Sequence, residues 1–92
     1  MANLNDKQLN EIRKEIDILD NQILELIEKR FELVEKVAKT KKEKGLPIRD
    51  IAREEEVINS KLQKTDLPEE FVKKLYRLII DTAIKMEKEK IK

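Results

Sequence analysis

Residues Leu9 to Val37 read LNEIRKEIDILDNQILELIEKRFELVEKV. Apolar residues recur in this segment in alternating steps of three and four, which places them in one stripe along a helix. The stripe consists of Leu9, Ile12, Ile16, Leu19, Ile23, Leu26, Leu33 and Val37. No glycine or proline interrupts the pattern, so we expect one helix from about Asp6 to Lys44.

Two groups of helix-breaking residues follow this segment and divide the rest of the chain. After Gly45-Leu46-Pro47, Asp50 is a good N-cap for a helix that ends at about Lys64. Asp66-Leu67-Pro68-Glu69 is a capping-box pattern with proline in the first turn, and predicts a helix from about Asp66 to Lys88. No segment alternates with period two, so the sequence predicts an all-α fold of three helices.

The apolar residues of the two shorter helices are expected to face the core. They are Ile51, Val57, Ile58 and Leu62 in the second helix, and Phe71, Val72, Leu75, Tyr76, Leu78, Ile79, Ile80, Ala83 and Met86 in the third.

The composition bounds the class of protein. With 92 residues, we expect one small domain over residues 1–92. A net charge of +1 argues against nucleic-acid or anionic-membrane binding. Since the chain shows no long apolar run and no leader, we expect a cytoplasmic protein. Without cysteine or histidine, disulfides, thiol nucleophiles and imidazole bases are excluded, and a structural zinc site is not expected.

The length of the first helix predicts a dimer. About 39 residues span roughly 58 Å, whereas a compact chain of this size is only about 30 to 35 Å across. One copy would leave much of the apolar stripe in water, so we expect a second copy to cover it in a homodimer. The alternative is a first helix that is broken and folds back, but residues 10–40 contain no turn signal.

Two cations interrupt the apolar face of the first helix. Arg30 stands where the sevenfold spacing calls for an apolar residue, and Lys41 lies about 20° further round the helix. Arg30 could simply extend to the edge of the bundle, and Lys41 could belong to a Lys-rich helix end. If both point inward, they need anions from the protein or from a ligand.

Carboxylates interrupt the other two apolar faces. Glu54 lies on the apolar side of the second helix, four residues after Asp50, and Arg53 can pair with either. Glu87 follows Ala83 by one turn on the apolar face of the third helix. Each has a simpler explanation, as a first-turn acid or a frayed helix end. Together with the two cations they indicate a polar pocket inside a helical bundle.

Arg13 lies beside the start of the apolar stripe, 17 residues before Arg30. That spacing corresponds to about 25 Å along a helix. If both arginines serve one site, Arg13 must therefore come from the partner chain.

The sequence resembles chorismate mutases of the all-α class. The resemblance covers nearly the whole chain and rests on Leu9-Asn10-Glu11-Ile12-Arg13, Ile16-Asp17, Leu19-Asp20, Leu26-Ile27 with Arg30, Lys39 with Lys41, and Pro47-Ile48-Arg49-Asp50-Ile51-Ala52-Arg53-Glu54. In the third helix it is looser, with Leu78-Ile79-Ile80 fixing the register. It implies an intertwined homodimer that converts chorismate to prephenate, in the synthesis of phenylalanine and tyrosine, without a metal or organic cofactor.

The resemblance also implies roles for individual residues. Arg30 and Arg13 of the partner subunit would bind the two substrate carboxylates, and Lys41 would donate to the ether oxygen. Glu54 would accept a hydrogen bond from the ring hydroxyl. The Asp50 backbone would also contact this hydroxyl, with Arg53 in a supporting position.

Two positions depart from the family pattern. Ala83 would face a substrate carboxylate, where a hydroxyl side chain is often found. Glu87 would donate to the ether oxygen, where many members have glutamine. An ionised Glu87 would repel that oxygen, whereas a protonated one can donate. We therefore expect kcat/KM to fall as the pH rises through the titration of Glu87.

The same residues leave other functions open. An isochorismate-pyruvate lyase on the same scaffold is one alternative, but the intact segment from Asp50 to Glu54 favours the mutase. A non-catalytic helical dimerisation module is another, and it predicts that Arg30 and Lys41 can be replaced without loss of stability. A nucleic-acid binder is disfavoured by the balanced charge and by only three aromatic residues.

Overall fold

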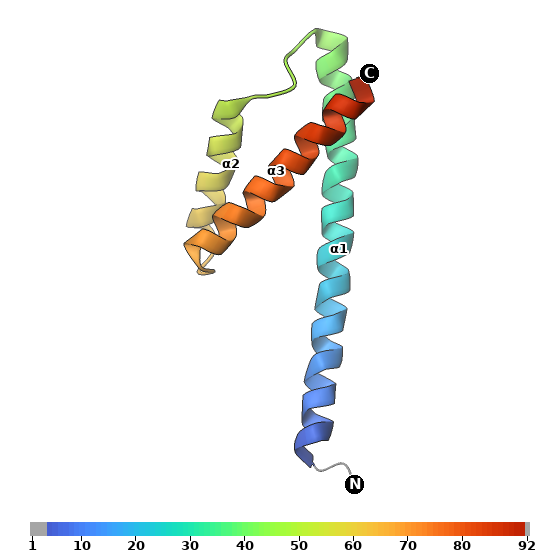
Figure 1. Cartoon of the computed structure of the whole chain (residues 1–92), viewed down its shortest axis with the longest axis vertical. Coiled ribbons are helices and arrows are strands. Elements are labelled where there is room, and N and C mark those ends of the chain that lie inside the picture. The colour runs from blue at the N-terminus through green and yellow to red at the C-terminus, as the bar shows by residue number, and fades with distance from the viewer. Residues whose placement is uncertain (1–3, 92) are drawn as a thin grey trace. The chain divides into compact units, whose positions relative to one another are not determined.

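A computed structural model describes residues 4–91 of the chain, with side chains for residues 6–90. Three helices account for the ordered elements: α1 (Leu4–Lys44), α2 (Ile51–Gln63) and α3 (Glu69–Ile91) (Figure 1). The described residues contain no strand. The all-α prediction is therefore confirmed, and α1 is one continuous helix rather than the broken helix of the alternative.

The chain divides into two compact units, Met1–Glu32 and Leu33–Lys92. Within its described residues, the first unit is helical throughout. The apolar stripe of this helix is exposed in the single chain, with Leu9 at 45%, Ile23 at 53% and Leu26 at 64%. This unit therefore presents an unpartnered apolar face.

Gly45 ends α1 with a left-handed turn. Its φ of +66° is in the region that glycine adopts without steric cost. Its N–H donates to the Lys42 carbonyl, and the Leu46 N–H donates to the Lys41 carbonyl over 2.8 Å. This pattern of two bonds is a Schellman motif, which satisfies the last carbonyls of the helix. The chain then turns toward α2.

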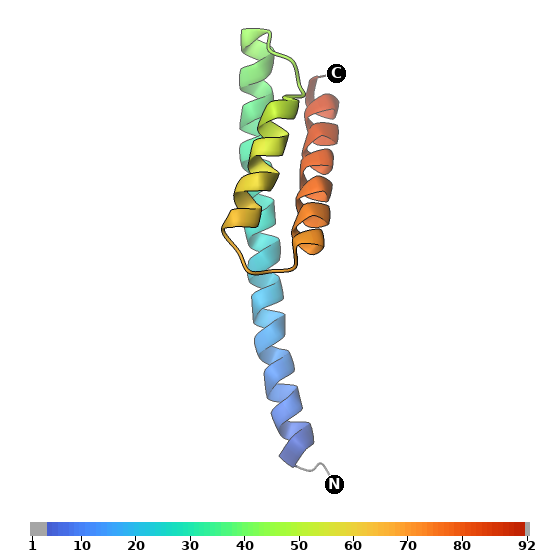
Figure 2. The same cartoon turned by 90° about the vertical axis from the view of Figure 1, so that its left-hand side faces the viewer.

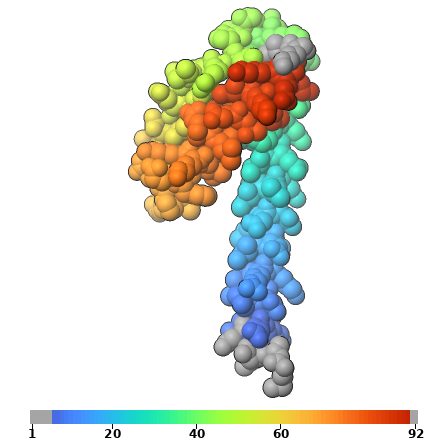
Figure 3. All heavy atoms as spheres, in the orientation of Figure 1, coloured from blue at the N-terminus to red at the C-terminus, as the bar shows by residue number. Residues whose placement is uncertain are grey.

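In the second unit α2 and α3 lie against each other (Figures 1 and 2). The space-filling view of Figure 3 shows the yellow-green atoms of α2 beside the orange to red atoms of α3. The buried apolar residues of this unit are Ala38, Val72, Ile79, Ile80 and Ala83. Long side chains join the end of α1 to α3, where Lys90 lies 3.9 Å from Glu35 and Lys41 lies 3.1 Å from Glu87.

The predicted start of the third helix is wrong. α3 begins at Glu69 and not at Asp66, because the Pro68 carbonyl accepts the first helical bond, from the Val72 N–H. The Leu67 N–H donates a hydrogen bond to the Thr65 hydroxyl oxygen.

Not all the apolar residues predicted to face inward do so. Ile51, Phe71 and Leu78 are 59%, 52% and 66% exposed, because these positions lie at the edges of apolar arcs wider than the contact between two helices. None of the helices described here is apolar over a length sufficient to cross a bilayer.

Candidate functional site

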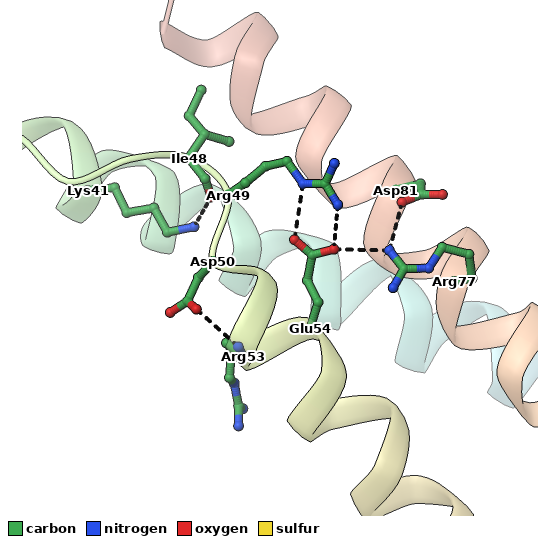
Figure 4. Close-up of polar contacts among 8 residues, drawn as sticks. All are labelled: Lys41, Ile48, Arg49, Asp50, Arg53, Glu54, Arg77 and Asp81. Carbon is green, nitrogen blue, oxygen red and sulfur yellow. Dashed lines mark hydrogen bonds and ion pairs between the residues drawn. The ribbon is translucent and has the colours of Figure 1, made fainter.

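The carboxylate of Glu54 lies in the first turn of α2 and is held by two arginines. Glu54 is only 7% exposed, as its place on the apolar side predicts. Arg49, just before the helix, donates from Nη2 to Oε1 over 2.8 Å and from Nε to Oε2 over 3.2 Å. Arg77 of α3 donates from Nη1 to the same Oε1 over 3.0 Å (Figure 4). One carboxylate therefore joins α2 to α3.

These contacts keep Glu54 ionised. The Arg49 guanidinium lowers the pKa of the Glu54 carboxyl below its ordinary value, burial acts in the opposite direction, and Arg77 lowers the pKa further. Arg77 also contacts Asp81, one turn later on α3, at 3.1 Å. Two cations and two anions thus balance, and Glu54 stays a hydrogen-bond acceptor at neutral and mildly acidic pH.

A second buried carboxylate, that of Glu87 on α3, pairs with Lys41 at the end of α1. Glu87 is 5% exposed, and its Oε1 lies 3.1 Å from the Lys41 Nζ. The ammonium also donates to the Ile48 carbonyl oxygen (Figure 4). An ammonium has three N–H donors. Two are engaged within the part of the chain that the structure describes, which leaves one for another acceptor.

The short segment before α2 connects these two clusters. Ile48 accepts a hydrogen bond from Lys41, and the next residue, Arg49, donates to Glu54. Ala83, 8% exposed, lies one helical turn before Glu87 on α3. Because its methyl group has no polar atom, this part of the α3 face is apolar.

Asp50 and Arg53 are placed differently from Glu54. Asp50 is the N-cap of α2, as predicted, and its Oδ1 accepts the Arg53 backbone N–H over 3.0 Å. The expected side-chain pairing of Arg53 is wrong, because its guanidinium bonds Glu56 over 2.7 Å on the exposed side of α2. Figure 4 shows the Arg53 side chain pointing away from Glu54.

Arg13 and Arg30 belong to the first unit. On α1, Arg13 is exposed and Arg30 is half-buried. Among the residues that the structure describes, neither guanidinium takes part in an ion pair. The second unit thus contains the Lys41–Glu87 pair and the Glu54 cluster, while the two predicted carboxylate ligands belong to the first unit.

The sequence reasoning missed the partners of Glu54. Arg49 was only part of a motif, and neither Arg77 nor Asp81 was singled out. One signal was available: Arg77 interrupts the widest apolar arc of the chain, just as Arg30 interrupts the stripe of the first helix. What the sequence cannot give is the rotation of α3 that turns Arg77 toward α2.

A surface hollow of about 550 Å³ lies on the face of α2 and α3. It is lined by Ile58, Lys73, Lys74, Arg77, Leu78 and Asp81. Although Arg77 belongs to both the hollow and the Glu54 cluster, no predicted site residue lines the hollow. Within the described part of the chain, no group of three His, Cys, Asp or Glu side chains is placed to hold a metal ion.

Comparison with known proteins relates the chain to one family. The model of the family described as chorismate mutase type II matches residues 12–88. A chorismate mutase of Methanocaldococcus jannaschii is 34% identical over 86 residues, which cover 90% of this chain and 87% of that protein. A bifunctional chorismate mutase/prephenate dehydratase of Aquifex aeolicus is 35% identical over 88 residues, 89% of this chain but 24% of that protein. The chain thus spans about a quarter of that bifunctional relative.

Proposed function

The chain belongs to the type II chorismate mutase family, and from this premise we propose that it converts chorismate to prephenate in aromatic amino acid biosynthesis. In this rearrangement an ether C–O bond breaks while a C–C bond forms within one molecule, so no nucleophile or oxidant is needed. A chain without histidine or cysteine can therefore support it. The rate depends on folding a flexible dianion and on stabilising the charge that develops on the ether oxygen.

The observation that carries the proposal is the environment of Lys41. Its ammonium is held by the Glu87 carboxylate and the Ile48 carbonyl, and retains one unused N–H. In the proposed reaction this N–H donates to the ether oxygen as the C–O bond stretches. Since Lys41 is already oriented, little reorganisation is needed when the charge develops.

Glu87 acts on the same oxygen. When protonated it donates a second hydrogen bond to the ether oxygen, and when ionised it repels that oxygen. In the free protein the Lys41 Nζ lies 3.1 Å from Glu87 Oε1. Turnover is therefore proposed to be fastest at the acidic side of the Glu87 titration.

Glu54 and its neighbours bind the ring of the substrate. Glu54 accepts a hydrogen bond from the ring hydroxyl, and the Asp50 backbone contacts the same hydroxyl. Arg53 supports this turn through its backbone N–H, which donates to Oδ1 of the N-cap residue Asp50. At Ala83 only backbone atoms can form a hydrogen bond with a substrate carboxylate.

Arg30 and Arg13 of the partner subunit bind the two substrate carboxylates in this proposal. Guanidinium groups suit this task because they form bidentate bonds with carboxylates. The 17-residue spacing excludes joint binding by one copy of α1. The exposed stripe of Leu9, Ile16 and Ile23 supports a homodimer, which we place in the cytoplasm.

The activity is tested by following the loss of chorismate absorbance with purified protein at pH 5 and pH 8. We expect turnover by the wild type, and Arg30→Ala to lower kcat/KM by about 10² to 10³. The same assay with isochorismate distinguishes the related lyase. Absence of chorismate turnover at both pH values would overturn the proposal.

The shared site is tested by mixing two inactive variants, Arg13→Ala and Arg30→Ala. A mixed dimer has one site with both arginines and one with neither. Random exchange of subunits should therefore restore about a quarter of the wild-type activity, because half of the dimers are mixed and each has one intact site. If both arginines came from one chain, mixing would restore nothing.

A further inference from the structure

Arg77 has no part in the proposed rearrangement, yet its guanidinium contacts Glu54. Its Nη1 lies 3.0 Å from Glu54 Oε1 and 3.1 Å from Asp81 Oδ1. α3 thus brings to a buried carboxylate of α2 a cation whose own orientation is fixed by an aspartate one turn away.

The contacts distinguish the two oxygens of Glu54. Oε1 accepts from Arg49 at 2.8 Å and from Arg77 at 3.0 Å, whereas Oε2 accepts, among the described residues, only from Arg49, at 3.2 Å. Each carboxylate oxygen has about two lone-pair positions. Oε1 is therefore saturated, and Oε2 keeps one position for a further donor.

We propose that Arg77 is a positioning residue, which occupies Oε1 of Glu54 so that Oε2 alone accepts the substrate's ring hydroxyl. The inference rests on the proposed function, since it concerns how the hydroxyl is bound. Arg77 itself does not touch the substrate. Its effect reaches the substrate only through the orientation and the charge of Glu54.

Arg49 alone does not define this geometry. The terminal torsion of a glutamate side chain is broad, and Arg49 lies on the irregular segment before α2 with its side chain 49% exposed. Arg77 is anchored on a helix and approaches from a second element. Without it, Oε1 regains a free lone pair and either oxygen can receive the hydroxyl.

The charge of Arg77 also matters. The charged groups that face Glu54 in the described structure are Arg49, before α2, and Arg77, on α3 with Asp81 beside it. Removing Arg77 leaves a buried carboxylate with one cation. Such a carboxylate is protonated at a higher pH, and a protonated Glu54 is a poorer acceptor.

The alternative is that Arg77 only joins α2 to α3. In that case its loss would lower the melting temperature and leave the pH dependence of catalysis unchanged. The pH dependence of catalysis therefore distinguishes the positioning role of Arg77 from a purely structural role.

The experiment measures kcat and KM for chorismate from pH 4 to pH 8 in wild type, Arg77→Met, Arg77→Gln and Arg77→Lys. Lys73→Gln is the matched control, because Lys73 lies one turn earlier on α3 and pairs only with Glu69 and Glu70 among the described residues. Circular dichroism identifies folded variants. The substrate's own carboxyl groups titrate identically in every sample, so only differences between variants are interpreted.

We expect Arg77→Met and Arg77→Gln to raise KM about tenfold at neutral pH and to move the acid limb of kcat/KM to higher pH. Arg77→Lys should restore the acid limb, since it keeps the charge. Lys73→Gln should match the wild type. As a readout that needs no catalysis, the Glu54 carboxyl followed by NMR should titrate at higher pH in Arg77→Gln than in wild type.

Several outcomes would overturn the inference. An unchanged acid limb and an unchanged Glu54 titration in Arg77→Gln would make Arg77 a structural link only. If the wild type turns over chorismate, the proposed function still holds even when Arg77 proves to be only a structural link. No turnover by the wild type would overturn the proposed function, and this inference with it.

Discussion

The two units differ in where their apolar and charged side chains lie. In the first unit, apolar side chains such as Ile16 and Ile23 are about half exposed, and the guanidiniums of Arg13 and Arg30 form no ion pair among the described residues. In the second unit, the carboxylates of Glu54 and Glu87 are buried, and each has a cation within 3.1 Å. The buried carboxylates of the second unit thus have partners within that unit, whereas the apolar side chains and the two arginines of the first unit are left exposed or unpaired within the described residues.

The largest effect is expected from a charge placed in the stripe of the first unit. Ile16 is 49% exposed in the single chain, so Ile16→Asp should cost that chain little. In the proposed dimer it buries an unpaired carboxylate. We expect a monomer by analytical ultracentrifugation and a loss of kcat/KM of about 10² or more, since Arg13 of the partner subunit would be absent.

Glu15→Gln is the control for this change, because Glu15 is the exposed neighbour of Ile16. It should remain dimeric and active. A monomeric and inactive Ile16→Asp would support the contrast between the units. An active monomer would show that the first unit needs no second copy.

The next largest effect is expected from the charge of Glu87, a buried carboxylate of the second unit. We expect wild-type kcat/KM to fall about tenfold for each pH unit above the titration of Glu87, because the ionised carboxylate repels the ether oxygen. Glu87→Gln keeps a donor at all pH values and should flatten this limb. Steady-state kinetics from pH 5 to pH 9 provide the measurement.

Glu89→Gln serves as the matched control, since Glu89 lies two residues later on α3 with its side chain exposed. Its pH profile should follow the wild type. A flat wild-type profile between pH 5 and pH 8 would contradict the assigned role of Glu87.

The sequence predicted much of the second unit because the signals there are local. Helical periodicity gave the three helices, and Gly45 and Asp50 were identified as the end of one helix and the cap of the next. The burial of Glu54 and Glu87 followed from their place on apolar faces.

The missed features depend on the placement of helices relative to one another. Arg77 reaches Glu54 only because α3 has a particular rotation against α2. Arg53 pairs with Glu56, three residues later on the exposed side of α2, while Glu54 is bonded by Arg49 and Arg77. The Pro68 carbonyl accepts the first hydrogen bond of α3, and the capping pattern in the sequence does not indicate this bond.

A smaller effect is expected on the acid stability of the second unit. The pKa of Glu54 is lower in the folded chain, mainly because Arg49 donates to it. The resulting stabilisation is complete above the ordinary glutamate value, near pH 4.3, and is lost as the pH falls through the folded value. Glu54→Gln should therefore destabilise the protein by about 1 to 2 kcal/mol at pH 7.

The difference between wild type and Glu54→Gln should shrink as the pH falls below the ordinary glutamate value, because Glu54 becomes protonated and loses its charge. Urea unfolding followed by circular dichroism at pH 7, 5 and 3 measures it. Glu56→Gln, an exposed position on the same helix, should change stability little at any of these pH values. A constant difference across the series would mean that the charge of Glu54 does not stabilise the fold.

The smallest effect is expected at Gly45, where the end of α1 leads into the segment that carries Ile48 and Arg49. An added Cβ would meet no atom within 4 Å, so the cost of Gly45→Ala is conformational and not a clash. A φ of +66° costs an alanine about 1 kcal/mol. Gly45→Asn should cost less, because asparagine adopts this region more readily. Urea unfolding should rank the proteins, from most to least stable, as wild type, Gly45→Asn and Gly45→Ala. Since the Lys41 carbonyl accepts from the Leu46 N–H in the same turn, unchanged stability in both variants would mean that this turn does not depend on a left-handed residue at position 45.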